Sequence, residues 1–154
     1  LQLVISANGN PKYFDQVITL AEQAPQFSHW KIIPFIQPSK DIDQMEAGLD
    51  KPYVFKDIIL KASELKFMPL EYENEKKIDM IVYLKDFTVH CKNKNLLQVV
   101  FIIMQDLLGE KALFQNINFV ELAQMPEQEE NELIHLYDLH LYLDEINKRD
   151  SQMQ

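Results

Sequence analysis

The stretch LQLVISANGNPKYFDQVITLAEQAP, residues 1–25, decides the first step of the fold. Apolar residues alternate with others over the first five positions, as in a strand, and an Asn-Gly-Asn turn at 8–10 ends the pattern. Pro11 suits the first position of a helix, and apolar residues then recur at spacings of three and four until Pro25. The stretch therefore predicts a strand, a tight turn and a helix.

A strand–turn–helix junction is also the place where nucleotide-binding proteins hold phosphate. Such a cradle needs several glycines, so that consecutive backbone amides can approach the anion, and this turn has only Gly9. We therefore expect Gly9 to supply a positive φ, and we expect the turn to reverse the chain without binding a ligand.

Residues 30–36 predict a second strand, near a sheet edge because Pro34 cannot donate a ladder hydrogen bond. Further elements follow: strands at 55–60, 66–72 and 78–84, a buried helix at 96–108 ending at Gly109, a strand at 117–122 and a short helix at 138–148. The strands at 66–72 and 78–84 are expected to form an antiparallel hairpin. The predicted class is α+β: a mostly antiparallel sheet with helices on one face, in the order β-α-β-β-β-α-β-α, an embellished split β-α-β (ferredoxin-like) plan.

Length and composition indicate one domain. The chain has 154 residues, 47% of them apolar, which suffices for one core and is too short for two ordinary domains. We predict a single domain over residues 1–154, and the start at Leu1 inside a strand pattern leaves open whether a longer polypeptide precedes it. Residues 37–52 are polar and contain two prolines and a glycine, which predicts a surface loop with one helical turn.

The charge limits the partners. A formal net charge of −9 repels phosphate backbones and anionic lipid surfaces, so we expect neither nucleic acid nor membrane as a partner. The longest apolar run, residues 96–108, is also shorter than the about 20 residues that a spanning helix needs. Cys91 is the only cysteine and cannot form an internal disulfide, which favours a cytoplasmic location.

Several segments resemble a family of uncharacterised bacterial proteins of about this size. They are LVISANGN and WKIIPF near the start, DLLGE and INFVEL in the second half, and a Leu-Tyr-Asp-Leu segment near the C-terminus. The resemblance covers most of the chain and rests on core and turn positions. It implies a shared fold and no assigned activity.

One cluster could bind a divalent metal ion: Glu132, His135, Asp138 and His140. A glutamate and a histidine three residues apart share a helical face in carboxylate-bridged metal sites, but those sites need a second such pair, which the chain lacks. The two histidines also stand five apart, whereas the zinc-protease motif needs four. The competing interpretation is an acidic, solvated stretch in which Asp138 caps a short helix.

No other chemistry is indicated. His90 and Cys91 are neighbours and, in an extended chain, point in opposite directions, so they cannot act as a dyad. None of the serines lies in a glycine-rich nucleophile motif. We therefore predict no catalytic residue and no cofactor.

The sequence favours a non-catalytic protein-interaction or regulatory domain. Its acidic surface would complement a basic protein and speed association, as in an inhibitor or immunity protein. The alternative is a metal-dependent hydrolase that uses the cluster from Glu132 to His140. A homodimer is a further hypothesis, because the helix at 96–108 has more than one apolar stripe. Either the chain covers its second stripe internally, or that stripe meets a copy of itself.

Overall fold

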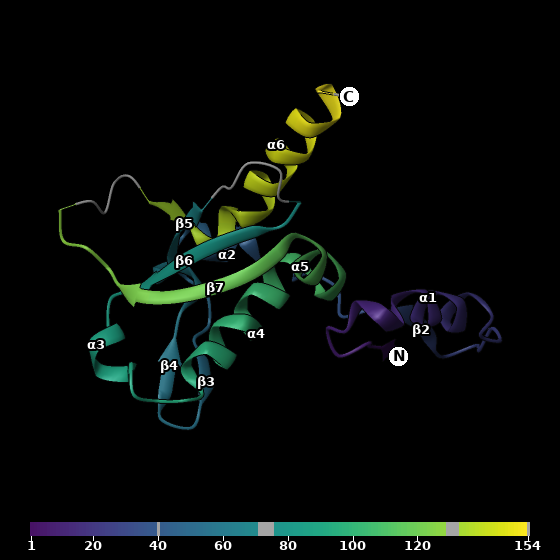
Figure 1. Cartoon of the computed structure of the whole chain (residues 1–154). Coiled ribbons are helices and arrows are strands. Elements are labelled where there is room, and N and C mark those ends of the chain that lie inside the picture. Colours follow the sequence, from purple (N-terminus) through teal and green to yellow (C-terminus); the bar gives the residue numbers. More distant parts are fainter. Residues whose placement is uncertain (40, 71–75, 129–132, 154) are drawn as a thin grey trace.

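The computed structural model describes residues 1–39, 41–70, 76–128 and 133–153, and it has a mixed α+β fold (Figure 1). The strands of the described residues form three small sheets. Figure 1 shows the first two strands and the helix between them as a unit set apart from the largest sheet. None of the described helices is long and apolar enough to cross a membrane.

The N-terminal unit is the β-α-β arrangement that the opening stretch predicts. Strand β1 (Gln2–Ile5) pairs in parallel with β2 (Lys31–Pro34), and a short 3₁₀ turn, η1 (Pro11–Tyr13), leads into helix α1 (Phe14–Glu22) between them. The unit has its own small core of Ala7, Phe14, Val17 and Phe35. Phe14 and Phe35 pack edge to face with ring centroids 5.1 Å apart.

The largest sheet has the strand order β7-β6-β5-β8. Strands β5 (Lys66–Leu70) and β6 (Ile78–Leu84) are antiparallel, which confirms the predicted hairpin, and the residues that join them, 71–75, lie outside the described part. Strand β7 (Ile117–Gln124) runs parallel to β6, and β8 (Ile134–His135) is antiparallel to β5.

Helix α4 (Leu96–Leu108) fills the main core. Seven of its side chains are buried within the chain: Leu96, Val99, Val100, Ile103, Met104, Leu107 and Leu108. Leu97 and Ile102 remain 41% and 37% exposed, so most of the apolar surface of α4 is covered internally. A homodimer through α4 stays a prediction with little uncovered surface to support it.

Four helices complete the described fold: α2 (Ile42–Glu46), α3 (Phe87–His90), α5 (Glu110–Asn116) and α6 (Leu139–Gln152). Helix α2 lies in the segment 37–52, where Met45 is buried in the main core. As predicted, α4 ends at Gly109, whose φ of 80° suits glycine. Helix α5 follows at once and was not predicted.

Two parts of the predicted plan are wrong. Residues 55–60 are not one strand: β3 (Tyr53–Phe55) and β4 (Ile58–Leu60) form an antiparallel hairpin, because the chain reverses at Lys56 with a positive φ of 55°. The strands also do not form one mostly antiparallel sheet, since β1 and β2 pair only with each other around a separate core. The ferredoxin-like order is therefore not confirmed.

Candidate functional site

The predicted metal-binding residues are distributed over β8 and the start of α6, and Glu132 lies outside the described residues. The ring of His135 stacks on Tyr137 with centroids 4.7 Å apart. Asp138 stands at the N-cap position of α6, but its side chain makes no cap hydrogen bond. His140 Nδ1 lies 3.0 Å from the backbone carbonyl of Tyr137 and must donate to it, because a carbonyl only accepts.

This arrangement does not form a metal site within the part of the chain that is described. There, no group of three or more histidine, cysteine, aspartate or glutamate side chains could hold a metal ion. The four-residue set stays a prediction because Glu132 lies outside the described residues. His140 nevertheless lines a pocket of a different kind.

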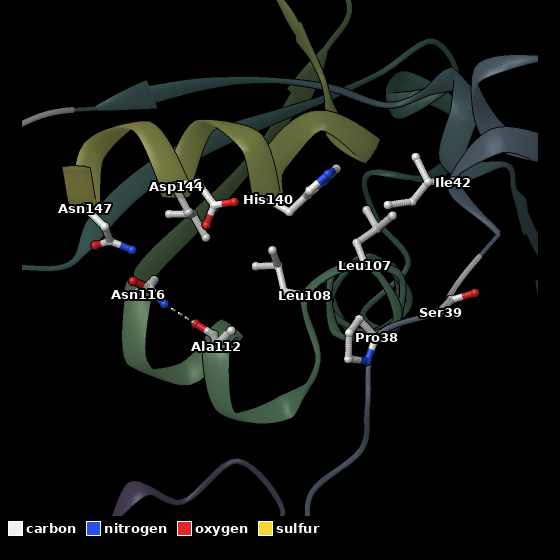
Figure 2. A pocket seen from close by; sticks show the side chains of 11 residues that line it. Pro38, Ser39, Ile42, Leu107, Leu108, Ala112, Asn116, His140, Asp144 and Asn147 are labelled. Atoms are coloured by element: carbon white, nitrogen blue, oxygen red, sulfur yellow. Dashed lines mark hydrogen bonds between the residues drawn. The ribbon is translucent and has the colours of Figure 1, made fainter. Parts of the chain in front are cut away.

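A pocket of about 340 Å³ lies between α6 and the region where α4 gives way to α5 (Figure 2). His140, Asp144 and Asn147 line it from α6, where spacings of four and three residues place them on one face. Leu108 and Ala112 line the opposite wall. Because Nδ1 of His140 donates to a backbone carbonyl, Nε2 is the ring nitrogen that could accept a hydrogen bond when the ring is neutral. This pocket therefore offers acceptors beside an apolar wall.

A larger pocket, of about 490 Å³, lies where the segment 39–53 meets α4. We call it the acidic pocket, since Asp41, Asp50 and Asp106 line it together with Lys51 and Tyr53. Asp41 and Asp50 come from one segment, and Asp106 comes from α4, more than 50 positions further along the chain. Two hydrogen bonds connect Asp106 to the neighbourhood of the other two aspartates. Its carboxylate accepts from the Tyr53 hydroxyl at 2.8 Å, and its backbone carbonyl accepts from the amide of Ser39.

The phenol of Tyr53 responds to this surrounding charge. Burial, the hydrogen bond to Asp106 and the negative charges of Asp106, Asp50 and Asp41, in that order, raise the pKa of Tyr53 well above its usual 10.0. Burial acts by disfavouring the phenolate, and each carboxylate adds to this effect by repelling a second negative charge. The acidic pocket therefore disfavours an added negative charge at Tyr53.

Asp50 is the most buried carboxylate of this pocket, with 7% of the residue exposed. Its Oδ2 accepts from the amide of Ser63 at 3.2 Å, whereas its Oδ1 has no hydrogen bond in the described structure. Lys61 Nζ lies 3.8 Å from Oδ1 and donates instead to the carbonyl of Gly48 at 2.7 Å. The negative charge of Asp50 is thus compensated by the ammonium group of Lys61, at a distance close to the longest that still counts as an ion pair.

The turn after β1 also binds an anion, supplied by the chain itself. Glu110 is fully buried, and its Oε1 accepts from the Ser6 hydroxyl at 3.0 Å, the Ala7 amide at 2.9 Å and the Gly9 amide at 3.0 Å. Its Oε2 accepts from the amide of Ile36 at 3.2 Å. Gly9 has the expected positive φ, 71°, and the turn does more than reverse the chain because it also binds Glu110. That the turn binds no external ligand stays a prediction.

One local feature of the sequence is consistent with this contact. Glu110 directly follows the glycine that ends the apolar helix α4, so it stands where a buried segment reaches a helix N-terminus. An acidic side chain there can satisfy amides. A single carboxylate oxygen accepts three donors here, so the turn holds an anion without a row of glycines.

Cys91 lies directly after α3. It is exposed, and its Sγ lies 3.5 Å from the carbonyl of Thr88. The chain is helical at this point and not extended as expected, because α3 ends at His90. Successive residues still point in different directions on a helix, so the conclusion that His90 and Cys91 do not form a dyad is unchanged.

Comparison with protein-family models, with curated proteins and with solved structures gives no match in any of the three. The resemblance to an uncharacterised bacterial family therefore stays a prediction. Three features of the molecule bear on its function: the acidic pocket, the pocket between α6 and the junction of α4 with α5, and the turn that binds Glu110.

Proposed function

We propose that the chain is a non-catalytic protein-interaction domain for a basic partner, and that the acidic pocket receives a cationic side chain of that partner. The observation that carries the proposal is the convergence of Asp41, Asp50 and Asp106 around the phenol of Tyr53. A guanidinium or ammonium group placed there would relieve the repulsion among the carboxylates. An inhibitor- or immunity-like role in the cytoplasm is the most concrete form of this proposal.

The distribution of charge supports the same direction of binding. In residues 1–36, Lys12 and Lys31 balance Asp15 and Glu22, so residues 37–154 carry the whole formal charge of −9. The acidic pocket belongs to this charged part. A basic protein would therefore be steered toward the pocket and away from the N-terminal unit, and the steering would weaken with salt.

The walls of the acidic pocket suit an arginine side chain in particular. Leu49 and Pro52 line the pocket, and Leu49 is 71% exposed, so an aliphatic stem can pack on them while its head group reaches the carboxylates. Arginine can bond a carboxylate with two parallel N–H groups, which lysine cannot. We expect an arginine-rich peptide to bind more tightly than its lysine-rich counterpart.

Nuclear magnetic resonance titration with an arginine-rich peptide tests the proposal. Chemical shifts should change most around Tyr53, and an Asp41→Asn, Asp106→Asn variant should bind about tenfold more weakly because it keeps the shape but removes two charges. Glu121→Gln is the matched control, since Glu121 is an exposed acid on β7. Equal binding by the double variant and wild type would contradict the proposal, as would shift changes spread evenly over residues 37–154.

A second experiment addresses the natural partner. The chain, immobilised and exposed to an extract of its native host at low and at high salt, should retain a basic protein at low salt and release it at high salt. The double variant should retain less of the same protein. Retention that is the same for both chains, or that salt does not weaken, would argue against the acidic pocket.

A further inference from the structure

The two-stranded sheet of the N-terminal unit is open on both edges within the described structure. Parallel strands are ordinarily buried inside larger sheets, and a sheet of two strands is only marginally stable. Here β1 remains well exposed, since Leu3 is 50% and Val4 44% accessible. The unit therefore has the form of a sheet that lacks neighbours.

The outer edge of β1 can accept another strand. The carbonyls of Leu1 and Ile5 accept from the amides of Lys31 and Phe35, so the odd-numbered residues of β1 direct their carbonyls toward β2. By the alternation of a strand, Gln2 and Val4 direct their amides and carbonyls outward. Pro34 weakens the outer edge of β2 as a donor, whereas β1 contains no proline.

Among the described residues, β1 itself carries none of the usual features that prevent edge pairing. Natural edge strands are often guarded by lysine, proline or a bulge, and the first six residues, LQLVIS, carry none of these residues and no charged side chain. Large exposed apolar residues are frequent in the same unit: Leu1, Leu3, Val4, Tyr13, Leu20, Phe27 and Trp30. Such an unguarded edge, with apolar surroundings, marks an interface.

We infer that the occupant is a second copy of this chain, paired antiparallel along β1 about a two-fold axis. The resulting sheet would run β2-β1-β1-β2 through both copies, with Val4 opposite Val4 and Gln2 opposite Ser6 of the second copy. The distribution of charge favours a second copy as the occupant. The N-terminal unit has no net charge, whereas residues 37–154 carry −9 and would repel the same residues of a second copy. Two copies can therefore meet through this unit, and a basic partner gains nothing from it.

Light scattering over a range of micromolar concentrations tests the inference. Wild-type chain should show twice the monomer mass of 18.2 kDa, and the Val4→Lys and Val4→Asp variants should each dimerise about tenfold or more weakly, because like charges would face each other across the seam. Val4→Thr is the control that keeps a β-branched, uncharged residue and should remain dimeric. Mixing the lysine and aspartate variants should restore a dimer containing one copy of each, which no misfolded variant could do.

Two outcomes would overturn the inference. One is a wild-type chain that stays monomeric at every concentration. The edge of β1 would then pair with an extended segment of another protein or with no strand at all. The other is a dimer that survives Val4→Lys but dissociates with Ile102→Glu, which would place the interface on α4. The peptide titration of the acidic pocket does not involve this edge, so either proposal can fail without the other.

Discussion

Glu110 Oε1 accepts a hydrogen bond of 3.0 Å from the amide of Gly9, although the two residues stand 101 positions apart. Ala7 and Ile36 donate to the same carboxylate, so one side chain joins the β1 turn, the end of β2 and the start of α5. The backbone reinforces this junction, since the amide of Glu110 donates to the carbonyl of Ile36 at 2.8 Å. Glu110 thus attaches the N-terminal unit to the main body.

Replacing this carboxylate should destabilise the chain strongly. Glu110→Ala removes the acceptor for three backbone amides and one hydroxyl around a fully buried site, and we expect a loss of about 3 to 5 kcal/mol of unfolding free energy. Glu110→Gln keeps one acceptor oxygen and should lose less. Chemical denaturation measures both.

Glu121→Gln, the exposed counterpart, is the control for Glu110→Gln and should change stability very little. Hydrogen exchange adds a local readout, because the amides of Ala7, Gly9 and Ile36 should lose protection in the alanine variant. A Glu110→Ala chain as stable as wild type would show that the carboxylate does not attach the unit.

Gly9 and Gly48 form a matched pair for a second prediction. Both have a positive φ, 71° and 69°, but an added Cβ at Gly9 would overlap the ring of Phe114, while no atom lies within 4 Å of one at Gly48. Gly48→Ala should therefore cost about 1 kcal/mol for backbone strain alone, and Gly9→Ala about 3 kcal/mol or more. Thermal unfolding compares the two.

The combination of Gly9→Ala with Phe114→Leu separates the clash from the strain. The smaller leucine should recover part of the loss, because it leaves room for the methyl group. Equal effects of alanine at Gly9 and Gly48 would mean that Phe114 moves aside freely.

A third prediction concerns Tyr53 at alkaline pH. Its pKa is raised in the folded chain above 10.0, so the unfolded chain releases this proton first as the pH rises. The stabilising contribution of the phenol is complete below pH 10 and declines above it. Wild type should accordingly lose its stability advantage over Tyr53→Phe as the pH rises from 10, which denaturation at several pH values measures.

Tyrosinate absorbance is the independent check on Tyr53. In the folded wild-type chain the Tyr53 phenol should not ionise near pH 10, so Tyr53→Phe should leave that part of the absorbance curve unchanged. If Tyr53→Phe removes a phenol that ionises near pH 10, the negative surroundings of the acidic pocket are weaker than described.

Metal binding tests the alternative of a hydrolase. No described group of ligands can hold a metal, and His140 Nδ1 is engaged by the Tyr137 carbonyl, so calorimetry with Zn²⁺, Mn²⁺ and Mg²⁺ should give at most millimolar affinity. A true site using His135 and His140 would bind more tightly as the pH rises through about 6.5, because the imidazoles must be neutral. Micromolar, pH-dependent binding that His140→Ala abolishes would favour the hydrolase.

Local signals in the sequence predicted the elements that depend on local chemistry. Glycine at position 109 marked the end of α4, and the strand patterns at 66–72 and 78–84 predicted the antiparallel pair β5 and β6. The turn at Lys56 escaped prediction because it adopts a positive φ without a glycine. Periodicity shows which face of a segment is buried but not which strand lies beside it, so the three-sheet arrangement could not be predicted.

The acidic pocket could not be predicted for a related reason. Asp41, Asp50 and Asp106 are ordinary surface acids in the sequence, and only the packing of segment 39–53 on α4 brings them together. Glu110 was missed for another reason. Glutamate is rarely buried, so its residue type alone predicts an exposed side chain. Both features depend on contacts between residues far apart in the chain.

The separation of Glu110 from the turn that it holds has a consequence during synthesis. Ribosomes add about 5 to 20 residues per second, so the chain takes about 5 to 20 seconds to advance the 101 positions from Gly9 to Glu110. During that interval β1 has been made, but the Glu110 carboxylate that binds the amides of its turn has not. The nascent chain can therefore make this attachment of its N-terminal unit only after Glu110 has been added.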